Sequence, residues 1–192
     1  MARTPTVEME LGYKAPDFSL PNVVSGNNQR YADIKGQKAT VVMFICNHCP
    51  FVIHVMEELI RIGNDYKDRG IGFVAISAND VSTHPDDSPE KMKALAEEKN
   101  FPFPYLYDET QEVAKAYTAA CTPDFSVFDS TKSCVYRGQL DDSRPGNDKA
   151  VNGSDLREVL DKLIADEPIP TNQKPSLGCN IKWKPGNEPS YY

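Results

Sequence analysis

The sequence lacks any apolar run that approaches the roughly 20 residues of a bilayer-spanning helix. It also lacks an excess of positive charge, and its net charge of -7 at pH 7 argues against nucleic acid or an anionic membrane as a partner. Residues 1–8 do not have the apolar core of a signal peptide, so we expect a cytoplasmic protein. We find no internal repeat and no low-complexity segment.

Cysteine is scarce as well. The 192 residues include five cysteines, an odd number and too few for a small secreted domain that disulfides hold together. We therefore expect mostly reduced thiols. The chain is long enough to form one domain with a substantial core, because the buried fraction of the surface rises with chain length.

Two of the five cysteines lie where a strand is predicted to lead into a helix. Residues 41–45 are apolar and rich in β-branched side chains, which is typical of a short buried strand. Cys46 and Cys49 follow directly, and after Pro50 the apolar residues recur at helical spacing. The N–H groups and dipole of a helix N-terminus stabilise a thiolate. The motif therefore predicts thiol redox chemistry.

The rest of the chain alternates between predicted strands and helices. The helix after the cysteines is expected to end near Gly70, and the other elements are predicted strands at 71–77, 105–107, 125–128 and 134–137 and predicted helices at 88–99, 111–118 and 156–165. This order implies an α/β fold. We expect a mixed sheet with parallel strands, an antiparallel hairpin at one edge and helices on both faces.

The two ends of the chain differ from its middle. Residues 12–36 are interpreted as an N-terminal extension with a short strand at 18–20, and residues 32–36 as a turn. Residues 166–192 contain five prolines, which favours an extended segment over a further domain. We therefore predict one domain at residues 1–165 and a C-terminal tail at 166–192 that docks on it.

Several short motifs occur in an order that is typical of one superfamily. They are Gly12-x-x-Ala15-Pro16-Asp17-Phe18-x-Leu20, Lys35-Gly36 before the core strand, Cys46-x-x-Cys49, Thr122-Pro123 before a later strand, and the ending at 178–184. Through these motifs the chain resembles the thioredoxin-like superfamily over about residues 12–184, within its redoxin branch of peroxiredoxin-like (AhpC/TSA) proteins. The resemblance implies a thioredoxin fold with an N-terminal extension and an extended C-terminal tail.

Thiol–disulfide exchange is the first activity that the resemblance implies. Cys46 is then the attacking thiolate, the more exposed of the two, which forms a mixed disulfide with the substrate, and Cys49 is the resolving thiol. His48 precedes Cys49 as in the more oxidising members, where an imidazolium stabilises the thiolate. Thr122 and Pro123 correspond to the cis-proline loop, whose backbone faces a substrate strand. The expected partners are protein or small-molecule thiols and disulfides.

A peroxiredoxin-like thiol peroxidase is the alternative, with peroxides as substrates. Cys49 and Pro50 match the peroxidatic Cys-Pro, in which the thiolate attacks a peroxide and becomes a sulfenic acid. Two departures weigh against this activity. Cys46 replaces the threonine of the T-x-x-C-P motif, and the usual arginine is absent from residues 120–124. The nearest substitutes are interpreted as ordinary surface residues: Arg137 and Arg144.

Metal binding is a second alternative of a different class. Soft ligands for zinc or copper are available from Cys46, His48, Cys49 and Cys121. The sequence has no second C-x-x-C and no H-x-x-x-H that would complete an ordinary structural site. We therefore predict neither a metal nor a cofactor.

Other polar and sulfur-containing residues are assigned lesser roles. Cys121 and Cys179 are candidates for additional redox residues, Cys179 because an extended tail can bring it to the motif as a resolving thiol. The loop with His84 and Asp87 shows no recognisable metal pattern, and Glu58 is expected on a solvated helix face. The strand before the motif offers no carboxylate, so proton transfer falls to the motif histidine, to water or to a residue elsewhere. The sequence leaves the oligomeric state open.

Overall fold

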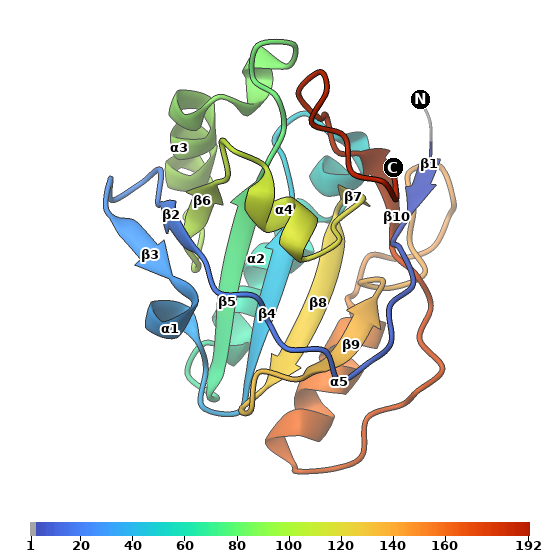
Figure 1. The fold of residues 1–192 in the computed structure, drawn as a ribbon. Helices are drawn as coiled ribbons and strands as arrows, with labels where there is room; N and C mark the ends of the chain where they lie inside the picture. Colours follow the sequence, from blue (N-terminus) through green and yellow to red (C-terminus); the bar gives the residue numbers. More distant parts are fainter. Residues whose placement is uncertain (1–2) are drawn as a thin grey trace.

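A five-stranded mixed sheet lies at the centre of the protein in the computed structural model, which describes residues 3–192 (Figure 1). Its strand order is β6-β5-β4-β8-β9. The strands are β4 (Ala39–Phe44), β5 (Ile71–Ser77), β6 (Tyr105–Tyr107), β8 (Asp124–Asp129) and β9 (Cys134–Gly138). The first three are parallel to one another, whereas β8 is antiparallel to β4 and to β9. The predicted mixed sheet with a hairpin at its edge is confirmed.

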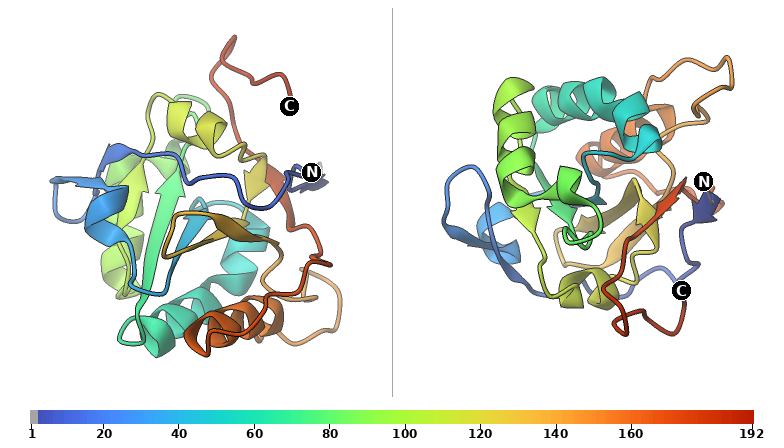
Figure 2. Two further views of the ribbon diagram at one scale, coloured as in Figure 1. Left: turned by 60° about the horizontal axis from the view of Figure 1, so that its bottom comes forward. Right: turned by 90° about the horizontal axis from the view of Figure 1, so that it is seen from above.

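Helices cover both faces of this sheet, as predicted (Figures 1 and 2). Side chains alternate along β4, so Val41 and Met43 join one core and Val42 and Phe44 join the other. The first core is completed by α2 (Pro50–Tyr66), α3 (Pro89–Glu98) and α5 (Ser154–Ile164). The second is completed by residues of α1 (Tyr31–Ile34) and α4 (Glu112–Ala116). Because β4 is buried on both faces, its sequence is continuously apolar rather than alternating.

The C-terminal segment contributes a strand that the sequence did not predict. A second sheet has the order β1-β10-β7, with β1 (Arg3–Pro5), β10 (Leu177–Asn180) and β7 (Cys121–Thr122) all antiparallel to their neighbours. The strand β10 lies between β1 and β7, two segments that are far apart in the sequence (Figure 2). Beyond it, Ile181 and Trp183 are buried in the second core. The division of the chain into a domain and a tail stays a prediction.

Other differences from the sequence-based expectations are local. The helix α2 ends at Tyr66, a few residues before Gly70, and residues 31–34 form the short helix α1 rather than a turn. The short strand expected at 18–20 is observed as β2 (Ser19–Pro21), which pairs with an unpredicted strand, β3 (Asn28–Arg30). In the described residues 3–192, no helix has the length and apolar character that crossing a membrane requires.

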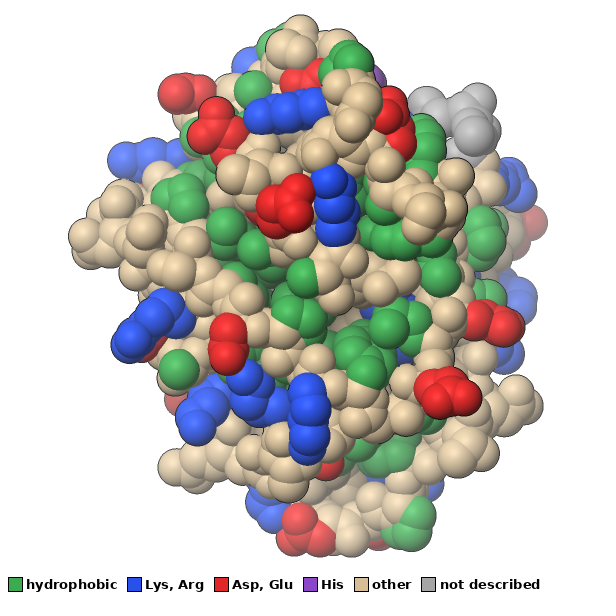
Figure 3. Space-filling view, viewed as in Figure 1, with side chains coloured by type: hydrophobic (Ala, Val, Ile, Leu, Met, Phe, Trp, Pro, Cys, Tyr) green, Lys and Arg blue, Asp and Glu red, His purple; other side chains and the backbone are tan. Residues whose placement is uncertain are grey.

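Glu58 was wrongly expected on a solvated face of α2. Its side chain is 3% exposed and accepts a hydrogen bond from Nε of Arg157, on α5, at 2.8 Å. Arg61 also pairs with it at 3.2 Å. A buried carboxylate needs such partners because an unpaired charge is costly to bury. Elsewhere on the surface, Figure 3 shows acidic and basic side chains interspersed over the face that it presents.

Candidate active site

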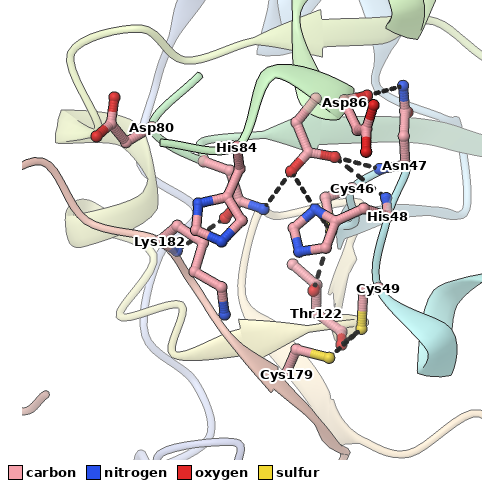
Figure 4. A network of polar contacts seen from close by, with 12 residues as sticks. Cys46, Asn47, His48, Cys49, Asp80, His84, Asp86, Thr122, Cys179 and Lys182 are labelled. Carbon is pink, nitrogen blue, oxygen red and sulfur yellow. Dashed lines mark hydrogen bonds and ion pairs between the residues drawn. The ribbon is translucent and has the colours of Figure 1, made fainter. Parts of the chain in front are cut away.

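The cysteine motif lies where the chain leaves β4 and enters α2, as predicted (Figure 4). Cys49 directly precedes the first helical residue, Pro50, and is therefore the N-cap residue of α2. Proline is well suited to this first helical position, because its missing N–H would have no partner within the helix. The N–H groups of Val52 and Ile53 donate to the main-chain carbonyl of Cys49 at 2.9 Å, and the positive end of the helix dipole there favours a negative charge on the cysteine.

Both motif sulfurs are shielded from solvent. Cys46 is 1% exposed and Cys49 is 0% exposed, so neither has the exposure that was expected of an attacking thiol. Thr122 contacts both of them: its hydroxyl lies 3.4 Å from Sγ of Cys46, and its main-chain carbonyl lies 3.1 Å from Sγ of Cys49, which donates to it in the thiol form. The peptide bond between Thr122 and Pro123 is cis, as expected. The cis-proline loop thus lies directly against the cysteine pair.

The surroundings shift the pKa values of the two thiols in opposite directions. The interaction with Cys46 lowers the pKa of Cys49 to about 5, with further help from Cys179 and from the N–H of Val52, although burial opposes the shift. The interaction with Cys49, burial and the nearby charge of Asp87 raise the pKa of Cys46 well above its ordinary value. The structure therefore favours the negative charge on Cys49, the residue at the helix N-terminus.

A buried carboxylate that the sequence did not single out organises the polar side of the site. Asp87 ends the short helix η1 (Pro85–Asp87) and is 0% exposed. Its Oδ1 accepts the main-chain N–H groups of Asn47 at 2.7 Å and His48 at 3.2 Å. Its Oδ2 accepts the side-chain amide of Asn79 at 2.8 Å and lies 2.6 Å from Nδ1 of His48. Asp87 therefore holds both residues between the two cysteines.

His48 is held on a second side by another histidine. The ring of His84 stacks on it with centroids 4.9 Å apart, and Figure 4 shows the two rings side by side. Burial, followed by the nearby charges of His48 and Lys182, lowers the pKa of His84. His84 is therefore neutral at neutral pH and can pack against its neighbour without charge repulsion. The loop that carries His84 and Asp87 belongs to the site, which its sequence pattern did not indicate.

Three of these side chains have the donor types of a metal site. One ligand atom each from Cys46, His48 and Asp87 lies within 4.8 Å of the other two. Such a mixture suits zinc. Both carboxylate oxygens of Asp87, however, already accept N–H groups. The hydrogen bonds account for the arrangement of the three residues, and the expected absence of a metal stays a prediction.

The structure places the two additional candidate cysteines differently. The thiol of Cys121 lies 3.9 Å from the hydroxyl of Thr6 and donates to the carbonyl of Pro123 at 3.6 Å, and burial raises its pKa well above the ordinary value. Cys179 lies on β10 with its Sγ 2.7 Å from Sγ of Cys49 (Figure 4). Cys179 is thus brought to the motif, whereas Cys121 contacts the cis-proline loop.

Comparison with protein families agrees with this geometry. Residues 11–137 match the family model described as the AhpC/TSA family. The protein belongs to the AhpC/TSA family. The chain is also 30% identical over 116 residues to "Putative peroxiredoxin Rv2521" of Mycobacterium tuberculosis strain H37Rv, a match that covers 60% of this chain and 68% of that protein. The AhpC/TSA member described here is therefore a redoxin, an oxidoreductase enzyme with a thioredoxin-like fold.

Solved structures with high similarity cover almost the whole chain. An uncharacterized conserved protein from Geobacillus kaustophilus has 59% identity and a TM-score of 0.95, over 97% of this chain and 98% of that one. The hypothetical protein SMc02350 from Sinorhizobium meliloti 1021 has 44% identity and a TM-score of 0.93, over 95% and 100%. Peroxidoxin BcpB from Mycobacterium tuberculosis, at 18% identity and a TM-score of 0.61 over 82% and 98%, shares the fold.

The arginine expected of a peroxidase in the AhpC/TSA family is not supplied by the nearest substitutes. Arg137 was interpreted as a surface residue, which is wrong because it is only 7% exposed. It donates to the carbonyls of Tyr117 at 3.1 Å and Thr118 at 2.8 Å and lies 3.5 Å from a carboxylate oxygen of Asp124. Arg144 is half-buried and donates to the side chain of Gln139 at 2.6 Å. Both arginines bind groups other than the motif sulfurs in the described part of the chain.

Proposed function

We propose that the protein is a thiol–disulfide oxidoreductase in which Cys46 and Cys49 alternate between a dithiol and a disulfide. The observation that carries this proposal is the position of Cys49. It is the N-cap residue of α2, and its pKa of about 5 makes it a thiolate at neutral pH. The substrates are protein or small-molecule disulfides, and the exchange requires no cofactor.

The proposed reaction has two exchange steps. The thiolate of Cys49 attacks one sulfur of the substrate disulfide and forms a mixed disulfide, while the other substrate sulfur leaves as a thiolate and takes up a proton from solvent. Cys46 then attacks Sγ of Cys49, closes the disulfide between the two motif cysteines and releases the second substrate thiol. These roles are the reverse of those expected from the sequence, because the negative charge is favoured on Cys49.

Cys46 needs a proton acceptor before it can act in the second step. Its pKa is raised well above the ordinary value, so few molecules carry the thiolate spontaneously. Nδ1 of His48 lies 4.0 Å from Sγ of Cys46, and Asp87 lies 2.6 Å from the same nitrogen. Because Nδ1 donates its own proton to the Asp87 carboxylate, it has no lone pair for a second proton, and the proton of Cys46 passes instead to the substrate sulfur that leaves Cys49.

A thiol peroxidase is the second candidate function. One observation favours it, which is the thiolate of Cys49 followed by Pro50 at the start of a helix in an AhpC/TSA protein. The thiolate attacks a peroxide, the O–O bond breaks, and Cys49 becomes a sulfenic acid as an alcohol or water leaves. The thiol of Cys46 then condenses with it, which releases water and gives the same disulfide. We rank this function second because Arg137 engages Asp124 rather than Cys49.

Two assays on the same variants test these functions. We expect the wild type and the control Cys134→Ser to reduce insulin disulfides at equal rates with dithiothreitol as reductant. Cys49→Ser falls to the background rate, and Cys46→Ser slows at least about tenfold, because a thiol held beside the mixed disulfide resolves it faster than an external one. Wild-type turnover in folded Cys49→Ser would refute the proposal. Peroxide consumption that requires Cys49 and exceeds the rate of insulin reduction would assign the second function.

A further inference from the structure

The C-terminal strand occupies the position beside the cis-proline loop where a substrate strand is expected. It pairs antiparallel with β7, with Cys179 opposite Thr122. The main-chain groups that the loop would offer to a substrate are therefore partly taken by the protein's own chain. Because Cys179 is on this strand, it lies where the cysteine of a disulfide substrate would lie.

Contacts on both sides of Cys179 fix this arrangement. The hydroxyl of Ser176 donates to the carbonyl of Pro123 at 2.6 Å, and the N–H of Ile181 donates to the carbonyl of Ala120 at 3.1 Å. Gly178 permits the close approach, because a Cβ at this position would clash with the main-chain carbonyl of Thr122. A rigid backbone atom cannot yield to such a Cβ, so the position of β10 depends on glycine at residue 178.

The two sulfurs are close enough to bond after a small movement. Sγ of Cys179 lies 2.7 Å from Sγ of Cys49, whereas a disulfide bond measures about 2.05 Å. Cys179 is 2% exposed, and its sulfur faces that of Cys49 in Figure 4. The sulfur of Cys179 is therefore a second partner with which Cys49 can form a disulfide, besides Cys46.

We propose that Cys179 is a third redox residue. It attacks the disulfide between Cys46 and Cys49 and forms a new disulfide with Cys49. This inference rests on the proposed function, which supplies the disulfide between Cys46 and Cys49. The sulfur of Cys179 loses its proton and attacks Sγ of Cys49, so that the new S–S bond forms as the old one breaks. The electron pair leaves on Cys46, which takes up the proton. The number of oxidised thiols is unchanged, so the step needs no further oxidant.

The product is a state in which the C-terminal strand is covalently bound to the start of α2. In this state Cys46 is again a thiol, while Cys49 is protected from further substrate. The same arrangement allows Cys179 to resolve a mixed disulfide on Cys49 directly when Cys46 is missing. The attack of Cys179 on a mixed disulfide at Cys49 can be observed by itself in a variant that lacks Cys46, so the test uses this step.

The test treats reduced Cys46→Ser with oxidised glutathione and measures the intact mass after an acid quench. Cys49 first takes up one glutathionyl group, and Cys179 then displaces it, so the expected product has lost two hydrogen atoms and carries no adduct. Peptide mapping should find Cys49 linked to Cys179. The closed form should exceed the adduct at least about tenfold, because an aligned intramolecular thiol has a very high effective concentration.

Three further variants in the Cys46→Ser background complete the test. Adding Cys179→Ser should leave the glutathionyl adduct on Cys49, and adding Cys134→Ser, the matched control on β9, should leave closure unchanged. Adding Gly178→Ala keeps the thiol of Cys179 but displaces the strand, so closure should slow at least about tenfold. Circular dichroism verifies that each variant is folded.

The outcomes separate this inference from the function on which it rests. A glutathionyl adduct that persists equally with and without Cys179 would overturn the inference while leaving Cys49 as the reactive sulfur. Closure that is equally fast in the Gly178→Ala variant would also overturn it, because the geometry of β10 would then be irrelevant. Failure of Cys49 to take up glutathione in any variant would refute the proposed function and this inference together.

Discussion

The lowered pKa of Cys49 makes the stability of the reduced protein depend on pH. The pKa is about 5 in the folded state and 9.0 for the unperturbed thiol. Between these values the unfolded chain binds one more proton than the folded one, so the free energy of unfolding rises with pH. The contribution is complete above pH 9.0 and is lost as the pH falls through about 5. Each pH unit in this window adds about 1.4 kcal/mol, which gives about 3 kcal/mol at pH 7.

Urea unfolding of wild type and Cys49→Ser, each with a phosphine reductant, measures this contribution. The difference between their free energies of unfolding should grow by about 1.4 kcal/mol per pH unit from about pH 5.5 to about pH 8.5. Subtraction removes the histidines and carboxylates, which titrate in both proteins. Cys134→Ser is the control, because burial raises the pKa of Cys134 and its effect should be constant over this range. A constant difference for Cys49→Ser as well would refute the assignment of the thiolate.

Three other substitutions probe the surroundings of the cysteines. Asp87→Asn should lower the free energy of unfolding in urea by about 2–4 kcal/mol, because it removes a buried charge that accepts several N–H groups; a loss below the error of the measurement would contradict this. Thr122→Val removes a hydroxyl that lowers the pKa of Cys46, so alkylation of Cys46 in a Cys49→Ser background should shift to higher pH; an unshifted profile would exclude this contact. Arg137→Lys should cost about 2–3 kcal/mol of stability but leave the alkylation profile of Cys49 unchanged, whereas a shifted profile would connect Arg137 to the site.

The central sheet and its long helices could be predicted because their signals are local. Residues 41–45 and 71–77 are short apolar runs that favour a strand covered on both faces, and β4 and β5 are found there. The short strands β1, β7 and β10 were missed. Strands of two to four residues have too few positions to show a period, and their pairing depends on segments far apart in the chain.

In the site too, the local motifs could be predicted and the contacts between distant segments could not. The cysteine pair and the Thr122-Pro123 pair are each made of residues that are close together in the sequence, so each motif could be read from it. Asp87 comes from a separate loop, and only the packing of η1 against the motif gives its carboxylate the N–H groups of Asn47 and His48. Glu58 was misplaced for a related reason, because its partner Arg157 lies on another helix.

The strand β10 lies against the buried sulfur of Cys49. A buried sulfur cannot meet a bulky disulfide, and Cys49 is 0% exposed. The strand β10 contacts that sulfur through Cys179 and is also hydrogen-bonded to β7. In the proposed exchange, a protein substrate that pairs with the cis-proline loop must therefore first displace β10, which also withdraws Cys179 from Cys49. We therefore expect closure by Cys179 only after a protein substrate strand has left, whereas a glutathionyl group, which does not pair as a strand, need not displace β10.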